Sequence, residues 1–251
     1  MNKILNINEL NSEKTLIINV DMINGFITEG ALHCSNIKRI VPNILELNKK
    51  LDKSVIRFFA DAHEHDSLEF KTFPKHCLIG STESQIIEEL EELAKSNVVY
   101  YKSTTNGFWS YEFKKFLEYN SFKNIIITGC CTDICILNLA LTLNTYFISI
   151  NEDVNIIVVE DAVDTFDAPG HNADTYNIMS LNILKSNGIQ VLRLHKQEED
   201  SLKLYPLTNE QRFTLECEIE SMLDCDTEDT VREDAQSALD AISSANINII
   251  K

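Results

Sequence analysis

Six short apolar runs constrain the fold of this 251-residue chain more than any other feature. Each run contains little polar alternation and is followed by polar residues. The runs are residues 15–20, 54–60, 97–101, 124–128, 155–159 and 189–194. Such runs are typical of strands that are buried on both faces, as in a parallel sheet.

Helical hydrophobic patterns separate these runs. They cover residues 36–52, 83–95, 110–119, 132–144 and 171–187. Alternating strands and helices imply right-handed crossovers with helices on both faces of the sheet. We therefore predict an α/β fold, a three-layer α/β/α sandwich around a mostly parallel sheet of about six strands. The pattern does not define the strand order.

Composition narrows the class of protein. Hydrophobic residues make up 44% and charged residues 24%, which is typical of a soluble globular domain. No apolar run approaches the ~18–20 residues that a membrane span needs, and the N-terminus lacks the apolar core of a signal peptide. We expect a cytoplasmic protein with reduced thiols and no membrane partner. The net charge of -17 argues against nucleic-acid binding.

The chain changes character near residue 196. Residues 196–251 carry 14 acidic and 5 basic side chains. Two helical faces are readable there, near 208–223 and 231–242. We predict one domain over residues 1–195 and an acidic helical C-terminal extension over 196–251. The extension packs on the body or on a second subunit of a homo-oligomer, or it is a solvated tail.

Ionisable residues follow several of the predicted strands. In open α/β sheets, ligands bind beyond the carboxyl ends of the strands. The first three strands end at Asp21, Asp61 and Lys102, and the fourth leads into residues 129–135. We therefore expect carboxylates, an amine and a thiol at one edge of the sheet.

Cys135 is the candidate nucleophile in this group. It lies in the first turn of a predicted helix, where the helix N-terminus lowers a thiol pKa. Backbone N–H groups there can form an oxyanion hole. Cys130 and Cys131 lie in the preceding turn, where they are better placed to supply backbone than sulfur. The alternative for Cys135 is a packed core thiol.

A second group has the composition of a metal site. It consists of Asp61, His63, Glu69 and His76. Carboxylate and imidazole ligands suit Zn²⁺, Mn²⁺ or Fe²⁺. His65 competes with these residues, because His63 and His65 point the same way in an extended chain. The alternative is an ordinary polar loop.

Taken together, these motifs resemble the nicotinamidase branch of the isochorismatase-like cysteine hydrolases. The resemblance covers about residues 14–195. It rests on six segments in family order: IINVDMINGF, FFADAHEHDSLEF, FPKHCLIGSTES, YYKSTTNGF, TGCCTDIC and EDAVDTFDAPGH.

The resemblance implies a catalytic triad of Asp21, Lys102 and Cys135. It also implies a cis peptide bond between Cys130 and Cys131, with the N–H groups of Cys131 and Cys135 as the oxyanion hole. Asp21 would take the thiol proton, and Lys102 would hold Asp21 in place.

The implied metal ligands are Asp61, His63 and His76, with Glu69 at the position of a further carboxylate. His65 then becomes the second choice. The implied cofactor is one divalent cation, with zinc expected and manganese or iron as alternatives.

The implied reaction is hydrolysis of nicotinamide to nicotinate and ammonia through a thioester, a step of NAD salvage. The metal would bind the pyridine nitrogen and position the ring. Phe26 and either Phe108 or Trp109 could sandwich that ring, although ordinary core packing is equally reasonable for Phe108.

Two departures from the family pattern leave alternatives open. The first motif commonly reads D-x-Q-x-D-F, and here Ile23 and Gly25 replace the glutamine and the second aspartate. Another amide or carbamoyl hydrolase therefore remains the main alternative. A catalytically silent metal-binding interaction protein and a thiol-redox protein using Cys130, Cys131 and Cys135 are weaker ones.

Overall fold

The computed structural model of the protein describes residues 3–195, 205–206 and 248–249. The chain divides into two compact units, Met1–Lys196 and Gln197–Lys251. The division lies one residue from the domain boundary that we expect from the sequence.

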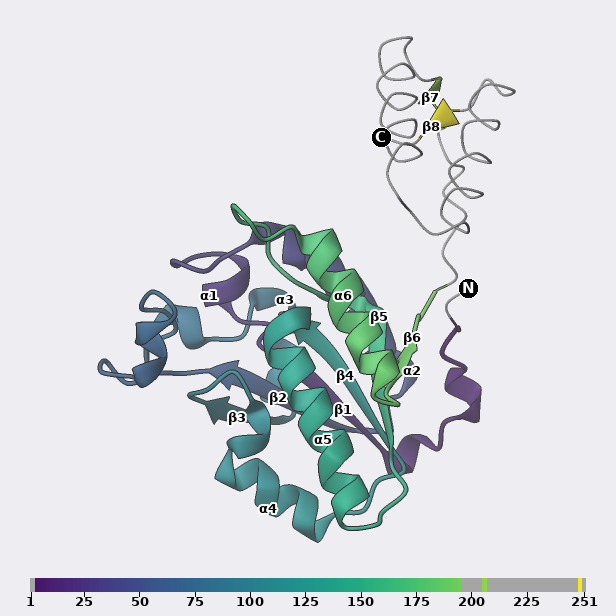
Figure 1. The fold of residues 1–251 in the computed structure, drawn as a ribbon. Helices are drawn as coiled ribbons and strands as arrows, with labels where there is room; N and C mark the ends of the chain where they lie inside the picture. Colours follow the sequence, from purple (N-terminus) through teal and green to yellow (C-terminus); the bar gives the residue numbers. More distant parts are fainter. Residues whose placement is uncertain (1–2, 196–204, 207–247, 250–251) are drawn as a thin grey trace, which may run out of the picture. The chain divides into compact units, whose positions relative to one another are not determined.

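The first unit contains one six-stranded sheet in the order β3-β2-β1-β4-β5-β6 (Figure 1). All neighbouring strands are parallel. The strands are β1 Thr15–Val20, β2 Val55–Asp61, β3 Val98–Lys102, β4 Asn124–Cys130, β5 Asn155–Asp164 and β6 Gln190–Leu192. All six predicted strands are present. β5 is longer than predicted and β6 is shorter.

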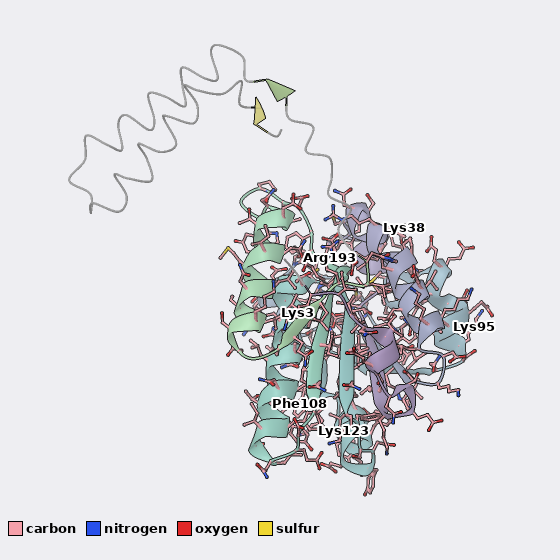
Figure 2. All side chains as sticks on the ribbon, turned by 90° about the vertical axis from the view of Figure 1, so that its right-hand side faces the viewer. Lys3, Lys38, Lys95, Phe108, Lys123 and Arg193 are labelled. Carbon is pink, nitrogen blue, oxygen red and sulfur yellow. The ribbon has the colours of Figure 1, made fainter. Side chains whose placement is uncertain are left out.

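Helices cover both faces of the sheet, which confirms the three-layer sandwich (Figure 2). One hydrophobic core lies under α2 (Val41–Lys50) and α3 (Glu88–Lys95). The other lies under α4 (Tyr111–Tyr119), α5 (Leu137–Ser149) and α6 (Ala173–Ser186). Alternate residues of β1 supply both cores, with Ile17 on the first face and Leu16 and Ile18 on the second. This alternation is why the strand is apolar throughout.

Three predicted helices begin differently from the hydrophobic pattern. Ser35–Ile40 is a 3-10 helix, and α2 starts at Val41 with proline in its first turn, where a missing N–H costs nothing. α3 starts only at Glu88, after a 3-10 turn over Thr82–Ser84. A π-helical turn, Thr132–Ile136, precedes α5. Periodicity cannot separate these turns from a continuous helix, because it follows burial and not hydrogen bonding.

The remaining short elements lie in connections. They are α1 Asn24–Ile27 and the 3-10 turns Ile7–Glu9, Ser12–Lys14, Leu68–Lys71 and Gly107–Trp109. None of the helices among the described residues has the length and apolar character that crossing a membrane would require.

In the second unit the structure describes one antiparallel pair, β7 (Tyr205–Pro206) with β8 (Asn248–Ile249). The sequence predicted no strand after residue 196, because two-residue strands leave no readable pattern. The acidic helices predicted near 208–223 and 231–242 lie outside the described residues.

Gly129 allows a close approach between the two central strands just before the turn that carries Cys135. Its φ of +108° lies in the region that favours glycine. A Cβ placed there would lie 2.0 Å from the carbonyl oxygen of Val20. Because that neighbour is backbone at the end of β1, it cannot move without displacing the strand.

We therefore predict that Gly129→Ala lowers the free energy of unfolding by at least ~2 kcal/mol, through overpacking and the positive φ together. Gly170→Ala is the matched control, because Gly170 also has a positive φ of +80° but no atom within 4 Å of an added Cβ. Urea denaturation of both variants should show the smaller loss for Gly170→Ala. Equal losses would contradict the close-approach argument.

Candidate active site

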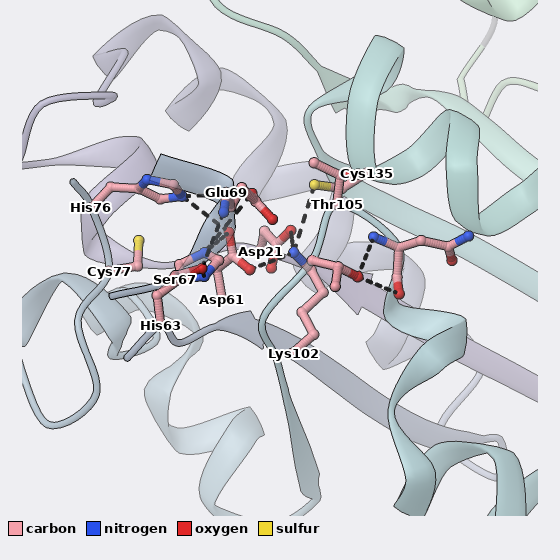
Figure 3. Close-up of polar contacts among 12 residues, drawn as sticks. Asp21, Asp61, His63, Ser67, Glu69, His76, Cys77, Lys102, Thr105 and Cys135 are labelled. Carbon is pink, nitrogen blue, oxygen red and sulfur yellow. Dashed lines mark hydrogen bonds and ion pairs between the residues drawn. The ribbon is translucent and has the colours of Figure 1, made fainter. Parts of the chain in front are cut away.

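Four neighbouring strands bring the ionisable residues together at their carboxyl ends (Figure 3). Asp21 directly follows β1, Asp61 ends β2 and Lys102 ends β3. Cys135 lies in the π-helical turn that follows β4. Because these strands are adjacent and parallel, residues far apart in the sequence meet at one edge.

Lys102 occupies the centre of this group. Its Nζ lies 2.8 Å from Asp21 Oδ2 and 2.9 Å from Asp61 Oδ1. The same nitrogen lies 3.7 Å from the Sγ of Cys135. All four residues are buried. Burial opposes the charge on Lys102, but the two carboxylates and the thiol outweigh burial and raise its pKa well above the usual value. Lys102 is therefore an ammonium ion in the folded protein.

The two carboxylates beside Lys102 have different properties. Burial raises the pKa of Asp21 to about 6, although Lys102 opposes this shift. Burial also acts to raise the pKa of Asp61, but Lys102, His63 and His76 outweigh it and lower that pKa. Asp21 can therefore gain and lose a proton near neutral pH, while Asp61 stays anionic.

Cys135 differs from the sequence expectation in its electrostatics. The position at a helix start predicted a lowered thiol pKa. In the structure burial raises the pKa well above its usual value, and the charges of Asp21 and Asp61 add to that effect, while Lys102 lowers it. The expectation was wrong because it took account of the helix terminus but not of the depth of the site. Cys135 consequently needs a base, and Asp21 is the adjacent group able to accept its proton.

The Cys130–Cys131 peptide bond is cis, as the resemblance implies. Cys131 and Cys135 both line one cavity. The side chain of Cys130 points elsewhere, and its thiol donates to the carbonyl oxygen of Asp21 at 3.2 Å. The turn thus presents Cys131 and Cys135 to the same space.

The four residues with metal-ligand chemistry also converge. Asp61 Oδ2 lies 3.2 Å from the Nε2 of His63 and 3.4 Å from the Nε2 of His76. Glu69 Oε1 lies 3.9 and 4.0 Å from the same two nitrogens. One ligand atom from each of the four residues lies within 4.8 Å of the others.

The hydrogen bonds of the two imidazoles aim the Nε2 atoms at one point. The Nδ1 of His63 lies 3.3 Å from Ser67 Oγ, and that of His76 lies 2.8 Å from the carbonyl oxygen of Pro74. The buried Nε2 of His63 has no hydrogen-bond partner. A buried nitrogen that has no hydrogen-bond partner and faces two carboxylates and a second imidazole fits a divalent cation.

His65 does not join this group. Its side chain is exposed, and it is absent from the cluster of ligand atoms. The expected extended geometry does not persist after His63, because the chain turns with a hydrogen bond from Ser67 N to the carbonyl oxygen of Glu64. This turn brings Glu69 back toward the two histidines.

A cavity of about 200 Å³ joins the nucleophile to the metal-ligand group. Its lining includes Cys135 together with Asp61, Glu69 and His76. The walls are mainly apolar, and they include the rings of Phe26, Phe73 and Phe166. The cavity therefore suits a small, flat, mostly apolar molecule with a reactive group held at Cys135.

Only one of the three aromatic residues that were predicted to bind the ring lies at the cavity. Phe26 lines the cavity, but Phe108 and Trp109 do not. Phe108 is buried in the core on the α5 face, with its ring centroid 5.2 Å from that of Tyr146. Trp109 is 63% exposed, and Lys114 lies over its ring. Phe108 is therefore a core residue and Trp109 a surface residue, and neither encloses this cavity as the sequence predicted.

Phe73 and Phe166 are cavity walls that the sequence did not predict. Both lie in the segments quoted for the family resemblance, FPKHCLIGSTES and EDAVDTFDAPGH. Their aromatic character was visible, but nothing in the sequence shows which aromatic side chain turns toward the cavity.

The two departures from the family motif lie outside the cavity lining. Ile23 is fully buried and forms a bridge with Ile86. A Cβ at Gly25 would lie 2.5 Å from the Sγ of Cys77 and 3.1 Å from Glu83. These residues therefore adjust the packing of the first loop rather than the surface that meets a substrate.

Comparison with known proteins agrees with this geometry. The family model described as the isochorismatase domain matches residues 15–187. Nicotinamidase 1 of Arabidopsis thaliana is 29% identical over 194 residues, which cover 65% of this chain and 78% of the plant protein.

Solved structures share the fold. The pyrazinamidase of Pyrococcus horikoshii in complex with zinc is 22% identical, with a TM-score of 0.60 over 72% of this chain and 99% of its own. The N-carbamoylsarcosine amidase of Thermoplasma acidophilum is 24% identical, with a TM-score of 0.59 over 74% and 99% of the two chains.

The matched model spans more than half of the chain, so the chain belongs to the isochorismatase family. Together with the similarity to the plant nicotinamidase, this match supports a hydrolase that acts on amides, in the nicotinamidase branch of the superfamily. The resemblance drawn from the six sequence segments is confirmed.

The metal-ligand group leads to a direct prediction. The wild-type protein, loaded with zinc and passed through a desalting column, should retain about one ion per chain. His76→Ala should lose most of that zinc, because the residues that surround the ligands cannot take the place of a missing imidazole. His65→Ala is the matched control and should retain it. Elemental mass spectrometry measures the zinc content of both variants. If His76→Ala retains as much zinc as His65→Ala, His76 is not a ligand.

Proposed function

We propose that this protein hydrolyses nicotinamide to nicotinate and ammonia, a reaction that would serve NAD salvage. The observation that carries the proposal is the buried ammonium of Lys102 between Asp21, Asp61 and the thiol of Cys135. That arrangement activates a nucleophile at the end of a cavity shaped for a flat ring. All these residues belong to the first compact unit, which we propose carries the reaction.

The proton moves along a short path. Asp21 accepts the proton of Cys135, and the resulting thiolate attacks the carboxamide carbon. Lys102 stabilises the thiolate and keeps Asp21 oriented. Asp21 then donates its proton to the departing ammonia, which leaves a thioester on Cys135. Asp21 next activates a water molecule, and hydrolysis of the thioester releases nicotinate.

The tetrahedral intermediate carries a negative oxygen that needs donors. We propose the backbone N–H groups of Cys131 and Cys135, because both residues line the cavity beside the nucleophile. Donors of this kind contribute ~3–4 kcal/mol each in a comparable hydrolase. Because they belong to a turn held by the strand β4, they require little reorganisation during the reaction.

A divalent cation would be held by Asp61, His63, Glu69 and His76. When bound, it would act as a Lewis acid that coordinates the ring nitrogen and selects a heteroaromatic amide. Two imidazoles and two carboxylates suit zinc, with manganese or iron as alternatives, and the zinc complex of the Pyrococcus relative supports this assignment. Phe26, Phe73 and Phe166 would enclose the ring.

Ammonia release from nicotinamide by the purified, zinc-loaded protein tests the proposal. Cys135→Ala should abolish turnover, whereas Cys34→Ser, a half-buried thiol outside the cavity lining, should retain it. Benzamide has the same ring size without the ring nitrogen, so it should be a poor substrate. Turnover of N-carbamoylsarcosine but not of nicotinamide would instead favour the carbamoyl hydrolase alternative.

The raised pKa of Asp21 gives a pH prediction. Only the ionised carboxylate can accept the thiol proton, so kcat/KM should rise with pH through about 6 and then level off. At pH 5 it should be about tenfold below the plateau. Metal content measured at pH 5 controls for loss of the cation. A flat profile between pH 5 and 7 with the metal retained would exclude Asp21 as the base.

A further inference from the structure

A second polar cluster lies beside the proposed catalytic residues and is not used by them. Asp133 belongs to the same π-helical turn as Cys135, two residues earlier. Its Oδ2 lies 2.9 Å from the Nε2 of His171, and its Oδ1 accepts a hydrogen bond from the hydroxyl of Thr165. One carboxylate thus joins the nucleophile turn to the segment between β5 and α6.

Both nitrogens of the His171 ring have acceptor partners. Nε2 faces Asp133, and Nδ1 lies 2.9 Å from the carbonyl oxygen of Phe166. Each ring nitrogen thus lies within hydrogen-bond distance of an oxygen, one on the backbone and one on a side chain. These two bonds define the plane of the imidazole.

Aromatic rings stack on both faces of the imidazole. The ring of Phe166 stacks on one face of His171, with centroids 3.9 Å apart and planes 5° apart. Tyr176, on α6, stacks on the other face at 3.7 Å and 24°. The phenyl ring of Phe166 is therefore held by a neighbour whose own orientation is set from two sides.

Phe166 is also a wall of the cavity that contains Cys135. Asp164, two residues before Phe166, anchors the start of this segment, because it accepts hydrogen bonds from Arg39 at 2.7 and 3.0 Å and from Asn177 at 2.9 Å. The position of the Phe166 ring is thus linked to that of the turn that carries Cys135.

We propose that Asp133 and His171 are positioning residues that hold the ring of Phe166 as a flat wall at a set distance from Cys135, and so select flat aromatic acyl groups. The identity of the amide rests on the proposed function, but the selection of a flat ring does not. His171 acts through Phe166 and touches no reacting atom.

The consequence is a separation of binding from chemistry. Without His171, Phe166 can rotate, so an aromatic group loses contacts that it makes equally in the ground state and the transition state. Such a loss raises KM and leaves kcat nearly unchanged. It should leave the reactivity of Cys135 toward small molecules unchanged as well.

Steady-state kinetics with nicotinamide test the expected rise in KM at nearly constant kcat. His171→Ala should raise KM about tenfold with kcat within about twofold, and Phe166→Ala should do the same. The double variant should be no worse than either single variant, because both remove one wall. His195→Ala, an exposed histidine outside the cavity lining, is the matched control and should change neither constant. Multiplying effects, or an equal fall in kcat and kcat/KM, would overturn the proposal.

Alkylation of Cys135 tests the same wall without any assumption about the substrate. The reagents are iodoacetamide and its flat aromatic analogue 2-iodo-N-phenylacetamide, with modification followed by mass spectrometry of the Cys135 peptide. His171→Ala should slow the aromatic reagent several-fold and change the small reagent less than twofold. Asp133→Asn, which preserves side-chain shape, should shift the ratio in the same direction and provides a second variant if His171→Ala does not fold.

The two proposals can fail separately. No nicotinamide turnover by the wild type, combined with the expected shift in the alkylation ratio, would reject nicotinamide and retain the flat wall. Nicotinamide turnover with an unchanged ratio in both variants would retain the reaction and reject the role of Asp133 and His171.

Discussion

The site depends on the placement of one ammonium ion in the interior. Lys102 is almost fully buried, and such a charge is costly unless it is paired. Asp21 and Asp61 both lie within hydrogen-bond distance of its Nζ. The three groups therefore need one another, and loss of any one would leave an uncompensated charge. This requirement explains why the ends of three adjacent strands must remain in register.

The same ion separates two functions that would otherwise interfere. Asp61 is shared between Lys102 and two imidazoles, so it stays anionic and available to a cation. Asp21 faces Lys102 and the thiol of Cys135 in a buried position, so its pKa is raised to about 6 and it can carry a proton. One lysine thus links a proposed metal centre to a proposed proton relay without placing the metal on the nucleophile.

Much of this arrangement was readable from the sequence. The apolar strands ending in Asp21, Asp61 and Lys102, and the turn leading to Cys135, predicted both the sheet and the edge where the site lies. The spacing of Asp61 and His63 indicated metal chemistry, but the choice between Glu69 and His65 was left open. A turn after His63 brings Glu69, and not His65, toward His63 and His76, and local spacing does not encode such a turn.

The sequence by itself determined the class of fold, the chemical groups and the chain order in which they occur, because strand burial and motif order are local properties. The tertiary structure alone decided which aromatic rings face the cavity, with Phe73 and Phe166 in place of Phe108 and Trp109. It also decided that burial raises the pKa of Cys135, against the effect expected at a helix start. Both outcomes depend on how deeply each side chain is buried in the packed layers and on the direction in which it points. Segments distant in the sequence set both properties, so the neighbouring residues carry no pattern that predicts them.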